Sequence, residues 1–289
     1  MDSRLLQPSY IKELCRRYGF SPQKSLGQNY LVSALPVNAM IAAGELTPDD
    51  TVIEIGPGFG VLTLALSPLV RRVVAFEIEQ TLRPYWEERC REYPNITVIW
   101  GEAIYELAKY QSELRGLRSY KVLANLPYQI TSYALRTVLE LEPPPERAVV
   151  MVQREVADRL SAGPGDMSLL SASVQYYGQP RITARVPRGS FWPPPQVDSA
   201  IVAIGGIEKR RSEIRCSGVE PAVFFRYIRA GFGHKRKQLA KNIAAQLAPD
   251  PETVKKALRA LSRPETVRAE ELSVGEWLEL ITLLEAAGR

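Results

Sequence analysis

The sequence predicts an α/β protein built on a doubly wound, mainly parallel sheet, with a small all-helical domain at its C-terminal end. Short apolar runs alternate with helical patterns over the first two thirds of the chain, as in parallel sheets with crossover helices. One of these runs leads directly into a glycine-rich turn, Gly56–Gly60, a typical strand-to-helix connection in such sheets. Beyond Gly206 charges rise and strand patterns stop. We therefore expect two domains, residues 1–206 and 207–289.

The individual elements follow from hydrophobic periodicity and from proline and glycine positions. An amphipathic helical pattern occupies residues 1–20, a helix is expected at 36–44, and a polar loop lies between them. The expected strands are 51–55, 73–76, 96–99, 121–124, 148–152, 182–186 and 199–204. Helices are expected at 61–69, 82–91, 132–141, 153–160, 169–177, 221–230, 236–246, 251–260 and 274–287. The last two strands are expected as an antiparallel pair, and the prolines at 193–195 between them impose a stiff, extended backbone.

Composition excludes several classes of site. The 289 residues include one histidine, His234, which argues against histidine metal sites and Ser-His-Asp triads. The three cysteines are scattered without C-x-x-C spacing, which argues against a zinc site or disulfides and for a reducing compartment. The formal net charge of +5 favours a polyanionic partner. No apolar stretch resembles a signal peptide or a membrane span. We expect a cytoplasmic protein without a metal.

Acidic residues follow two of the predicted strands. Glu77 ends the second strand, 21 residues after Gly56, and Glu102 follows the third strand. In open α/β sheets the carboxyl ends of the strands bind ligands, and an acidic residue at the spacing of Glu77 suits ribose hydroxyls. The alternative is a solvated carboxylate. A G-x-G-x-G turn with an acidic second strand suits both NAD enzymes and S-adenosylmethionine (SAM) methyltransferases.

The segment Asn125–Tyr128 follows the fourth predicted strand. Asn125 offers an amide carbonyl as acceptor, Pro127 stiffens the loop, and Tyr128 offers a ring on which a base can stack. An acceptor and a stacking ring three residues apart suit an enzyme that holds a planar amine. The alternative is a strand-to-helix turn with a packed tyrosine.

Four motifs in this order, each weak alone, together closely resemble the ribosomal RNA adenine dimethyltransferases, specifically the small-subunit enzymes. They are Lys24–Leu31, Glu54–Thr63, Asn125–Tyr128 and Ser190–Ala200. Weaker similarity extends to residues 151–159, 231–238 and 268–273, so the resemblance covers nearly the whole chain from about residue 20.

The resemblance implies a Rossmann-like, SAM-dependent enzyme that dimethylates N6 of two adjacent adenines. These adenines lie in the 3′-terminal hairpin of small-subunit (16S) rRNA. The implied partner is that rRNA or an assembling 30S subunit, and the protein is expected to be a monomer. The family implies cofactor contacts at Gln28, Asn29, Leu31, Gly56, Gly58, Glu77, Glu102 and Asn125. Glu77 would bind the ribose, Glu102 the cofactor's adenine and Gly56 its methionine part. Tyr128 and Phe191 would sandwich the flipped target base.

Two positions depart from the family pattern. The family usually has Asp where Glu102 stands, so the contact to the cofactor's amino group is expected to shift. Residues 165–168 replace a lysine and a Tyr-Gly pair, so a loop that faces the rRNA is expected to differ.

This residue set suits methyl transfer to a weak nucleophile. We expect the Asn125 carbonyl and the Leu126 or Pro127 backbone carbonyl to accept the two amine hydrogens and to direct the nitrogen lone pair at the methyl group. Such alignment contributes on the order of 7 kcal/mol or more in favourable systems. No strong base or metal is required. Unstacking the base costs a few kcal/mol, which stacking on aromatic rings offsets.

Basic residues in the second half of the chain form the expected rRNA contact. They are Arg154, Arg159, His234, Lys235, Arg236, Lys237 and Lys241. The alternative is a solvated charged face. Binding through phosphate contacts would weaken steeply with salt.

Two other functions compete with this prediction. One is a large-subunit rRNA adenine methyltransferase of the macrolide-resistance type, which shares the glycine turn and a similar Asn-x-Pro-Tyr; the form of Asn125–Tyr128 and residues 193–198 favour the small-subunit enzyme. The other is a non-catalytic ribosome assembly factor, against which the intact glycine turn, Glu77, Asn125 and Tyr128 argue.

Overall fold

The computed structural model describes residues 2–22, 28–247 and 250–287, without the side chain of Tyr128. The chain divides into two compact units. Unit 1 contains residues 1–157 and 180–205, and unit 2 contains residues 158–179 and 206–289. Residues 158–179 therefore group with the C-terminal unit, although they were predicted from the sequence to lie in the first domain. The functional division at residue 206 stays a prediction.

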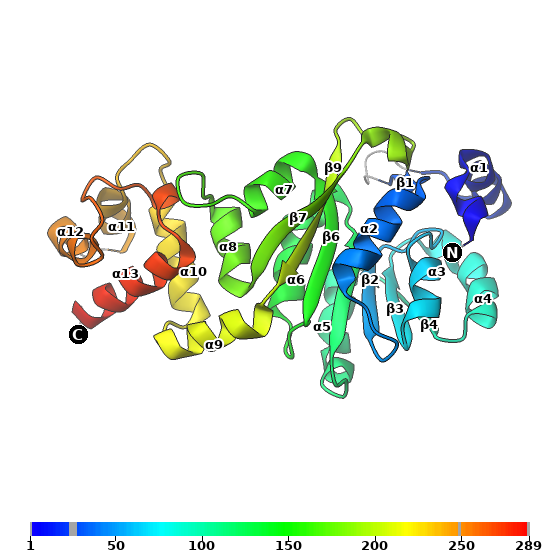
Figure 1. Cartoon of the computed structure of the whole chain (residues 1–289), viewed down its shortest axis with the longest axis horizontal. Helices are drawn as coiled ribbons and strands as arrows, with labels where there is room; N and C mark the ends of the chain where they lie inside the picture. The colour runs from blue at the N-terminus through cyan, green and yellow to red at the C-terminus, as the bar shows by residue number, and fades with distance from the viewer. Residues whose placement is uncertain (1, 23–27, 248–249, 288–289) are drawn as a thin grey trace. The chain divides into compact units, whose positions relative to one another are not determined.

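Unit 1 is built on a seven-stranded sheet in the order β4-β3-β2-β5-β6-β9-β7 (Figure 1). Its strands are β2 (Thr51–Ile55), β3 (Arg72–Glu77), β4 (Ile96–Trp100), β5 (Tyr120–Asn125), β6 (Arg147–Gln153), β7 (Gln179–Val186) and β9 (Ser199–Gly205). The five strands from β4 to β6 are parallel, and β9 is antiparallel to β6. The predicted doubly wound, mainly parallel sheet is confirmed.

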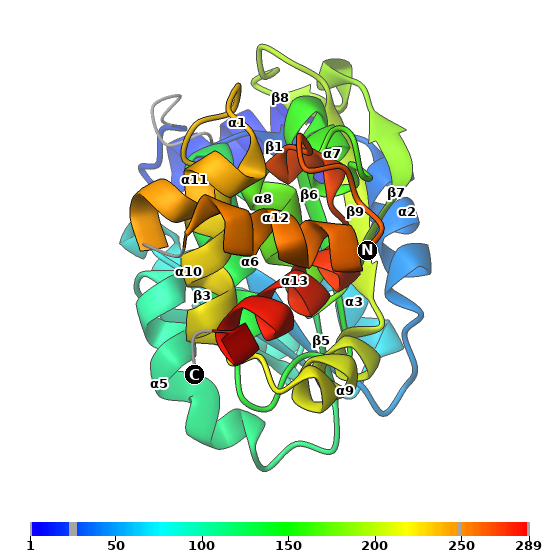
Figure 2. The same cartoon turned by 90° about the vertical axis from the view of Figure 1, so that its left-hand side faces the viewer.

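The central strands are apolar because helices cover both faces of the sheet. Every residue of β2 and five of the six in β5 are buried, as expected of parallel strands between two helical layers. Helix α2 (Ala34–Gly44) lies on one face and α5 (Ala103–Leu114) on the other (Figures 1 and 2). The other helices of unit 1 are α1 (Pro8–Arg17), α3 (Thr63–Leu66), α4 (Arg83–Glu92) and α6 (Thr131–Glu140).

The sheet reverses its winding between β2 and β5. From β2 the chain proceeds to β3 and β4 on one side, whereas β5 and β6 lie on the other. Such a reversal opens a crevice at the carboxyl ends of the two strands. A second, two-stranded sheet pairs β1 (Tyr30–Leu31) antiparallel with β8 (Phe191–Trp192).

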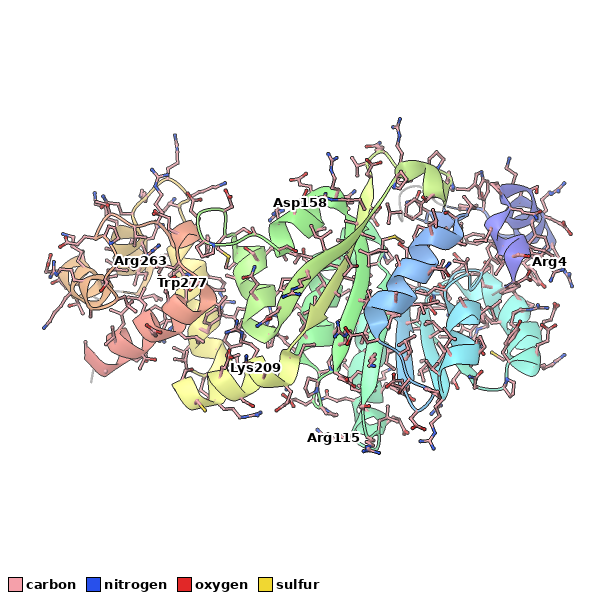
Figure 3. The ribbon with its side chains drawn as sticks, viewed as in Figure 1. Arg4, Arg115, Asp158, Lys209, Arg263 and Trp277 are labelled. Atoms are coloured by element: carbon pink, nitrogen blue, oxygen red, sulfur yellow. The ribbon has the colours of Figure 1, made fainter. Side chains whose placement is uncertain are left out.

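The described part of unit 2 contains helices and no strand beyond the start of β7. Its helices are α8 (Leu169–Tyr177), α9 (Ile207–Ser217), α10 (Pro221–Gly231), α11 (Leu239–Leu247), α12 (Pro251–Ala260) and α13 (Val274–Ala287). Tyr176 stacks on Phe224 with ring centroids 4.2 Å apart, and Trp277 of α13 is fully buried (Figure 3). The predicted helical C-terminal region is confirmed. Helix α7 (Arg154–Leu160) runs from unit 1 into unit 2.

Some elements differ from the sequence prediction. Helices α5 and α9 were not predicted, and the helix expected at 236–246 begins at Leu239. The helix expected at 61–69 consists of α3 followed by a 3₁₀ turn at Ser67–Leu69. Within the described residues no helix has the length and apolarity needed to cross a bilayer.

Candidate functional site

The glycine turn after β2 needs glycine for two separate reasons. Gly56, Gly58 and Gly60 all have positive φ values, of 69°, 54° and 81°, which side chains disfavour. There is also no room for a side chain at two of them. A Cβ at Gly58 would lie 2.8 Å from the Tyr30 ring, and one at Gly60 would lie 2.7 Å from the Trp86 ring.

Two side chains of helix α4 donate hydrogen bonds to backbone carbonyl groups of this turn. The Trp86 indole Nε1 donates to the Gly58 carbonyl at 3.0 Å, and the Tyr85 hydroxyl donates to the Phe59 carbonyl at 2.7 Å. Both aromatic side chains are buried. These two hydrogen bonds hold the turn against α4. Neither residue was predicted from the sequence, because a contact between separate elements leaves no local pattern.

Glu77 joins the end of β3 to the same turn. Its carboxylate accepts hydrogen bonds from the Gly58 N–H at 3.0 Å and from the Glu79 N–H at 2.8 Å. Burial raises the pKa of Glu77, and these backbone donors oppose the rise by stabilising the charged form. The predicted acidic residue at the strand end is thus fixed beside the glycines.

A cavity of about 280 Å³ lies at the carboxyl ends of β2, β3 and β5. It brings together ten of the residues predicted from the sequence, from five separate segments of the chain. They are Gln28, Asn29, Leu31, Gly56, Gly58, Glu77, Glu102, Asn125, Leu126 and Pro127. Leu31 is buried, Asn29 and Asn125 are half-buried, and Glu102 is exposed at the start of α5. All of them belong to unit 1.

The charged groups that line this cavity are acidic. Glu54, Glu77, Glu79 and Glu102 contribute carboxyl groups, and the described lining contains no lysine or arginine. Such a lining favours a ligand that carries positive charge and disfavours a pyrophosphate. Of the two cofactor classes that suit the glycine turn, this lining favours the one with a cationic centre.

Glu54 is an acidic residue for which no role was predicted from the sequence. It lies in β2, is 2% exposed, and its Oε2 atom has no hydrogen-bond partner among the described residues. Burial raises the pKa of Glu54 to about 8. The signal in the sequence was a glutamate inside an otherwise apolar strand.

One long hydrogen bond orients the Asn125 amide at the end of β5. Its side-chain Nδ2 donates to the backbone carbonyl of Asn29 at 3.5 Å, so the amide carbonyl oxygen points away from that contact. The Pro127 carbonyl already accepts from the Ile130 N–H at 3.2 Å and from the Thr131 hydroxyl at 3.3 Å. Of the two backbone carbonyls considered from the sequence, that of Leu126 is therefore the better acceptor for a ligand.

Phe191, one of the two predicted stacking residues, does not join the described lining of the cavity. Phe191 pairs with Leu31 between β8 and β1, is 3% exposed and packs in the hydrophobic core of unit 1. The side chain of Tyr128 lies outside the described residues, as do residues 24–27 of the first motif. The stacking roles stay predictions.

The predicted rRNA-binding residues are exposed. Arg154 and Arg159 lie on α7. The basic turn, which we define as His234–Lys237 with Lys241, lies between α10 and α11 in unit 2 and at the start of α11. Buried Asn242 holds this turn by donating to the carbonyls of Gly231 at 2.6 Å and His234 at 3.0 Å.

The family model of ribosomal RNA adenine dimethylases matches residues 19–286. The chain belongs to this family. A small-subunit rRNA methyltransferase A from Dehalococcoides mccartyi is 42% identical, with 92% of this chain and 89% of the relative covered. One from Pelotomaculum thermopropionicum is 38% identical over 98% of each chain. The predicted family membership is confirmed.

Solved structures support the same fold. A dimethyladenosine transferase from Plasmodium falciparum aligns with a TM-score of 0.74 at 26% identity, covering 89% of this chain and 98% of that structure. The 23S rRNA methyltransferase ErmE aligns with a TM-score of 0.67 at 23% identity, covering 89% and 100%. At that identity the second similarity extends to the fold alone.

Proposed function

We propose that this protein transfers methyl groups from SAM to N6 of two adjacent adenines in the 3′-terminal hairpin of 16S rRNA. The observation that carries the proposal is the acid-lined cavity with the Asn125 amide at the end of β5. Family membership and relatives named for the small subunit support the same reaction and substrate.

The donor groups of the cavity fit SAM. When bound, SAM supplies a methyl group already activated by the positive sulfur. The carboxyl groups of Glu54, Glu77, Glu79 and Glu102 suit a cation. We propose that Glu77 binds the ribose of SAM and that Glu102 binds its adenine. The remaining proposed contacts to SAM come from Gln28, Asn29, Leu31, Gly56 and Gly58. The described residues contain no group of three or more acidic, histidine or cysteine side chains suited to a metal.

Two oxygens at the end of β5 would orient the target amine. The Asn125 amide carbonyl and the Leu126 backbone carbonyl would each accept one amine hydrogen, which directs the nitrogen lone pair toward the methyl group. The amine proton becomes acidic after transfer and can leave to water, so no strong base is required. Orientation is the main contribution that this chain makes to the rate.

We propose that Tyr128 and Phe191 stack on the extruded adenine. Base stacking on an aromatic ring contributes about 1–3 kcal/mol. Phe191 is 3% exposed, so this role requires its ring to become uncovered when RNA binds.

The basic turn and the arginines of α7 would contact rRNA phosphates. We expect a Lys235→Ala/Arg236→Ala variant to bind 16S rRNA more weakly while SAM affinity is unchanged. The slope of log K against log salt should decrease in magnitude by about 1.4–1.8, because two phosphate contacts are lost. Filter binding across a salt series measures this.

A matched control removes two cations that are already compensated. Lys255 and Arg259 of α12 form ion pairs with Glu252 and Glu265, so the Lys255→Ala/Arg259→Ala variant should keep the wild-type salt slope. Equal slopes for wild type and the Lys235→Ala/Arg236→Ala variant would remove the basic turn from the interface.

The test of the function is methyl transfer from labelled SAM to small subunits isolated without this modification. We expect label in two adjacent adenines of 16S rRNA, located by primer extension. A parallel assay offers 23S rRNA, and label there instead would support the large-subunit alternative, which is favoured less because relatives at 38–42% identity are named for the small subunit. SAM binding without transfer to either rRNA would favour the assembly-factor alternative.

A further inference from the structure

Glu54 is an acidic side chain with unusual surroundings. It sits in the middle of the sheet, is 2% exposed, and yet lines the cavity that carries the proposed activity. Its Oε2 atom has no hydrogen-bond partner among the described residues. A buried ionised carboxylate without a partner costs several kcal/mol, so such a group normally takes up a proton.

The groups around Glu54 agree with a neutral carboxyl group. From β3, Glu77 faces it and its negative charge disfavours a second one. From α3, the buried Thr63 hydroxyl, which has no hydrogen-bond partner among the described residues, favours the ionised form. From β5, the polar side chain in the lining is the uncharged Asn125. The cation of that strand, Lys121, forms an ion pair with Asp50 at 3.0 Å and donates a hydrogen bond to the Glu45 carbonyl at 2.5 Å.

We propose that Glu54 is a neutral acid before the cofactor binds and releases its proton as the cationic cofactor enters the cavity. This inference rests on the proposed function, because it takes SAM as the ligand. When SAM binds, the O–H bond of the Glu54 carboxyl group breaks and the proton passes to solvent. The new carboxylate then faces the ligand's positive charge. Glu54 thereby couples cofactor affinity to pH.

The expected pH dependence has a definite sign. The pKa of Glu54 is raised to about 8, so at pH 7 about nine tenths of the protein carries the proton before binding. Because the cationic ligand favours the ionised form, SAM affinity should rise about tenfold per pH unit from pH 6 to 7 and level off above pH 8. Binding at pH 7 should release close to one proton.

The test is calorimetry of SAM binding at pH 7 in buffers of different ionisation enthalpy, with wild type and Glu54→Gln. The α-amino group of SAM also titrates near this pH, but it does so with both proteins, so their difference isolates Glu54. We expect the wild type to release about one proton more per SAM than Glu54→Gln. The variant should also lose the tenfold rise in affinity between pH 6 and 7.

Thr63→Val provides a second variant that keeps the carboxyl group. Removing the hydroxyl that favours the charged form should move the midpoint of the affinity change to higher pH; an unmoved midpoint would overturn the assignment to Glu54. Circular dichroism verifies the fold of both variants. Equal proton release by wild type and Glu54→Gln would refute the coupling while leaving SAM binding intact. A wild type that binds no SAM would instead refute the proposed function.

Discussion

Replacing Asn125 with alanine is expected to lower kcat for methyl transfer by about 10²–10³-fold while SAM still binds. The side chain lines the cavity, and its Nδ2 contact to the Asn29 carbonyl fixes the direction of the amide. Alanine removes the acceptor that would orient the amine, and an unoriented amine loses much of the advantage of a bound substrate. Single-turnover transfer with saturating SAM and RNA measures the effect.

Gln129→Ala is the matched control for this prediction. Gln129 is also an amide that lines the cavity, four residues further along the chain in the 3₁₀ turn Tyr128–Ile130, but it is exposed and has no proposed contact to the amine. We expect near wild-type turnover. An equal loss in both variants would assign the effect to the loop as a whole, and full turnover by Asn125→Ala would remove Asn125 from the proposed role.

Gly60→Ala is expected to impair both stability and SAM binding. A non-glycine residue at a φ of 81° is strained by about 1–3 kcal/mol. In addition, the new Cβ would lie 2.7 Å from the Trp86 ring, so Trp86 must move and its hydrogen bond to the Gly58 carbonyl is disturbed. We expect SAM affinity to fall by at least about tenfold, which corresponds to 1.4 kcal/mol, as measured by calorimetry alongside thermal unfolding.

Gly218→Ala separates strain from crowding. Gly218 has a similar φ of 67°, but no atom lies within 4 Å of the Cβ that alanine would add, and it ends α9 in unit 2. We expect a smaller loss of stability and unchanged SAM affinity. If Gly60→Ala bound SAM as tightly as Gly218→Ala does, the fit between the turn and Trp86 would have no part in cofactor binding.

Local patterns in the sequence predicted most of the sheet and the residues of the cavity. The strands are short apolar runs, and parallel strands align their carboxyl ends at one edge, so Gly56, Glu77, Glu102 and Asn125 converge without further information. The missed helix α5 did carry a signal, since its buried residues Ile104, Leu107 and Leu114 have helical spacing. Helix α9 carried a weaker one, because only Ile207 and Ile214 of its eleven residues are buried.

Other features depend on contacts between distant segments. The grouping of residues 158–179 with the C-terminal helices depends on packing such as that of Tyr176 against Phe224. Burial of Phe191 follows from its pairing with Leu31, far away in the sequence. The choice of Leu126 over Pro127 as acceptor follows from the hydrogen bonds already made to Pro127. None of these leaves a periodic or compositional pattern.

The hydrogen bond from the Trp86 indole to the glycine turn makes the fluorescence of Trp86 sensitive to ligand binding in the cavity. The ring is 1% exposed and its N–H is tied to the carbonyl of Gly58, which itself lines the cavity. Indole emission responds to the polarity and hydrogen bonding around the ring, so ligand entry should alter the intrinsic fluorescence without any added dye. The Trp86→Phe variant should lose this change in emission, and the remaining tryptophans would give only a constant background.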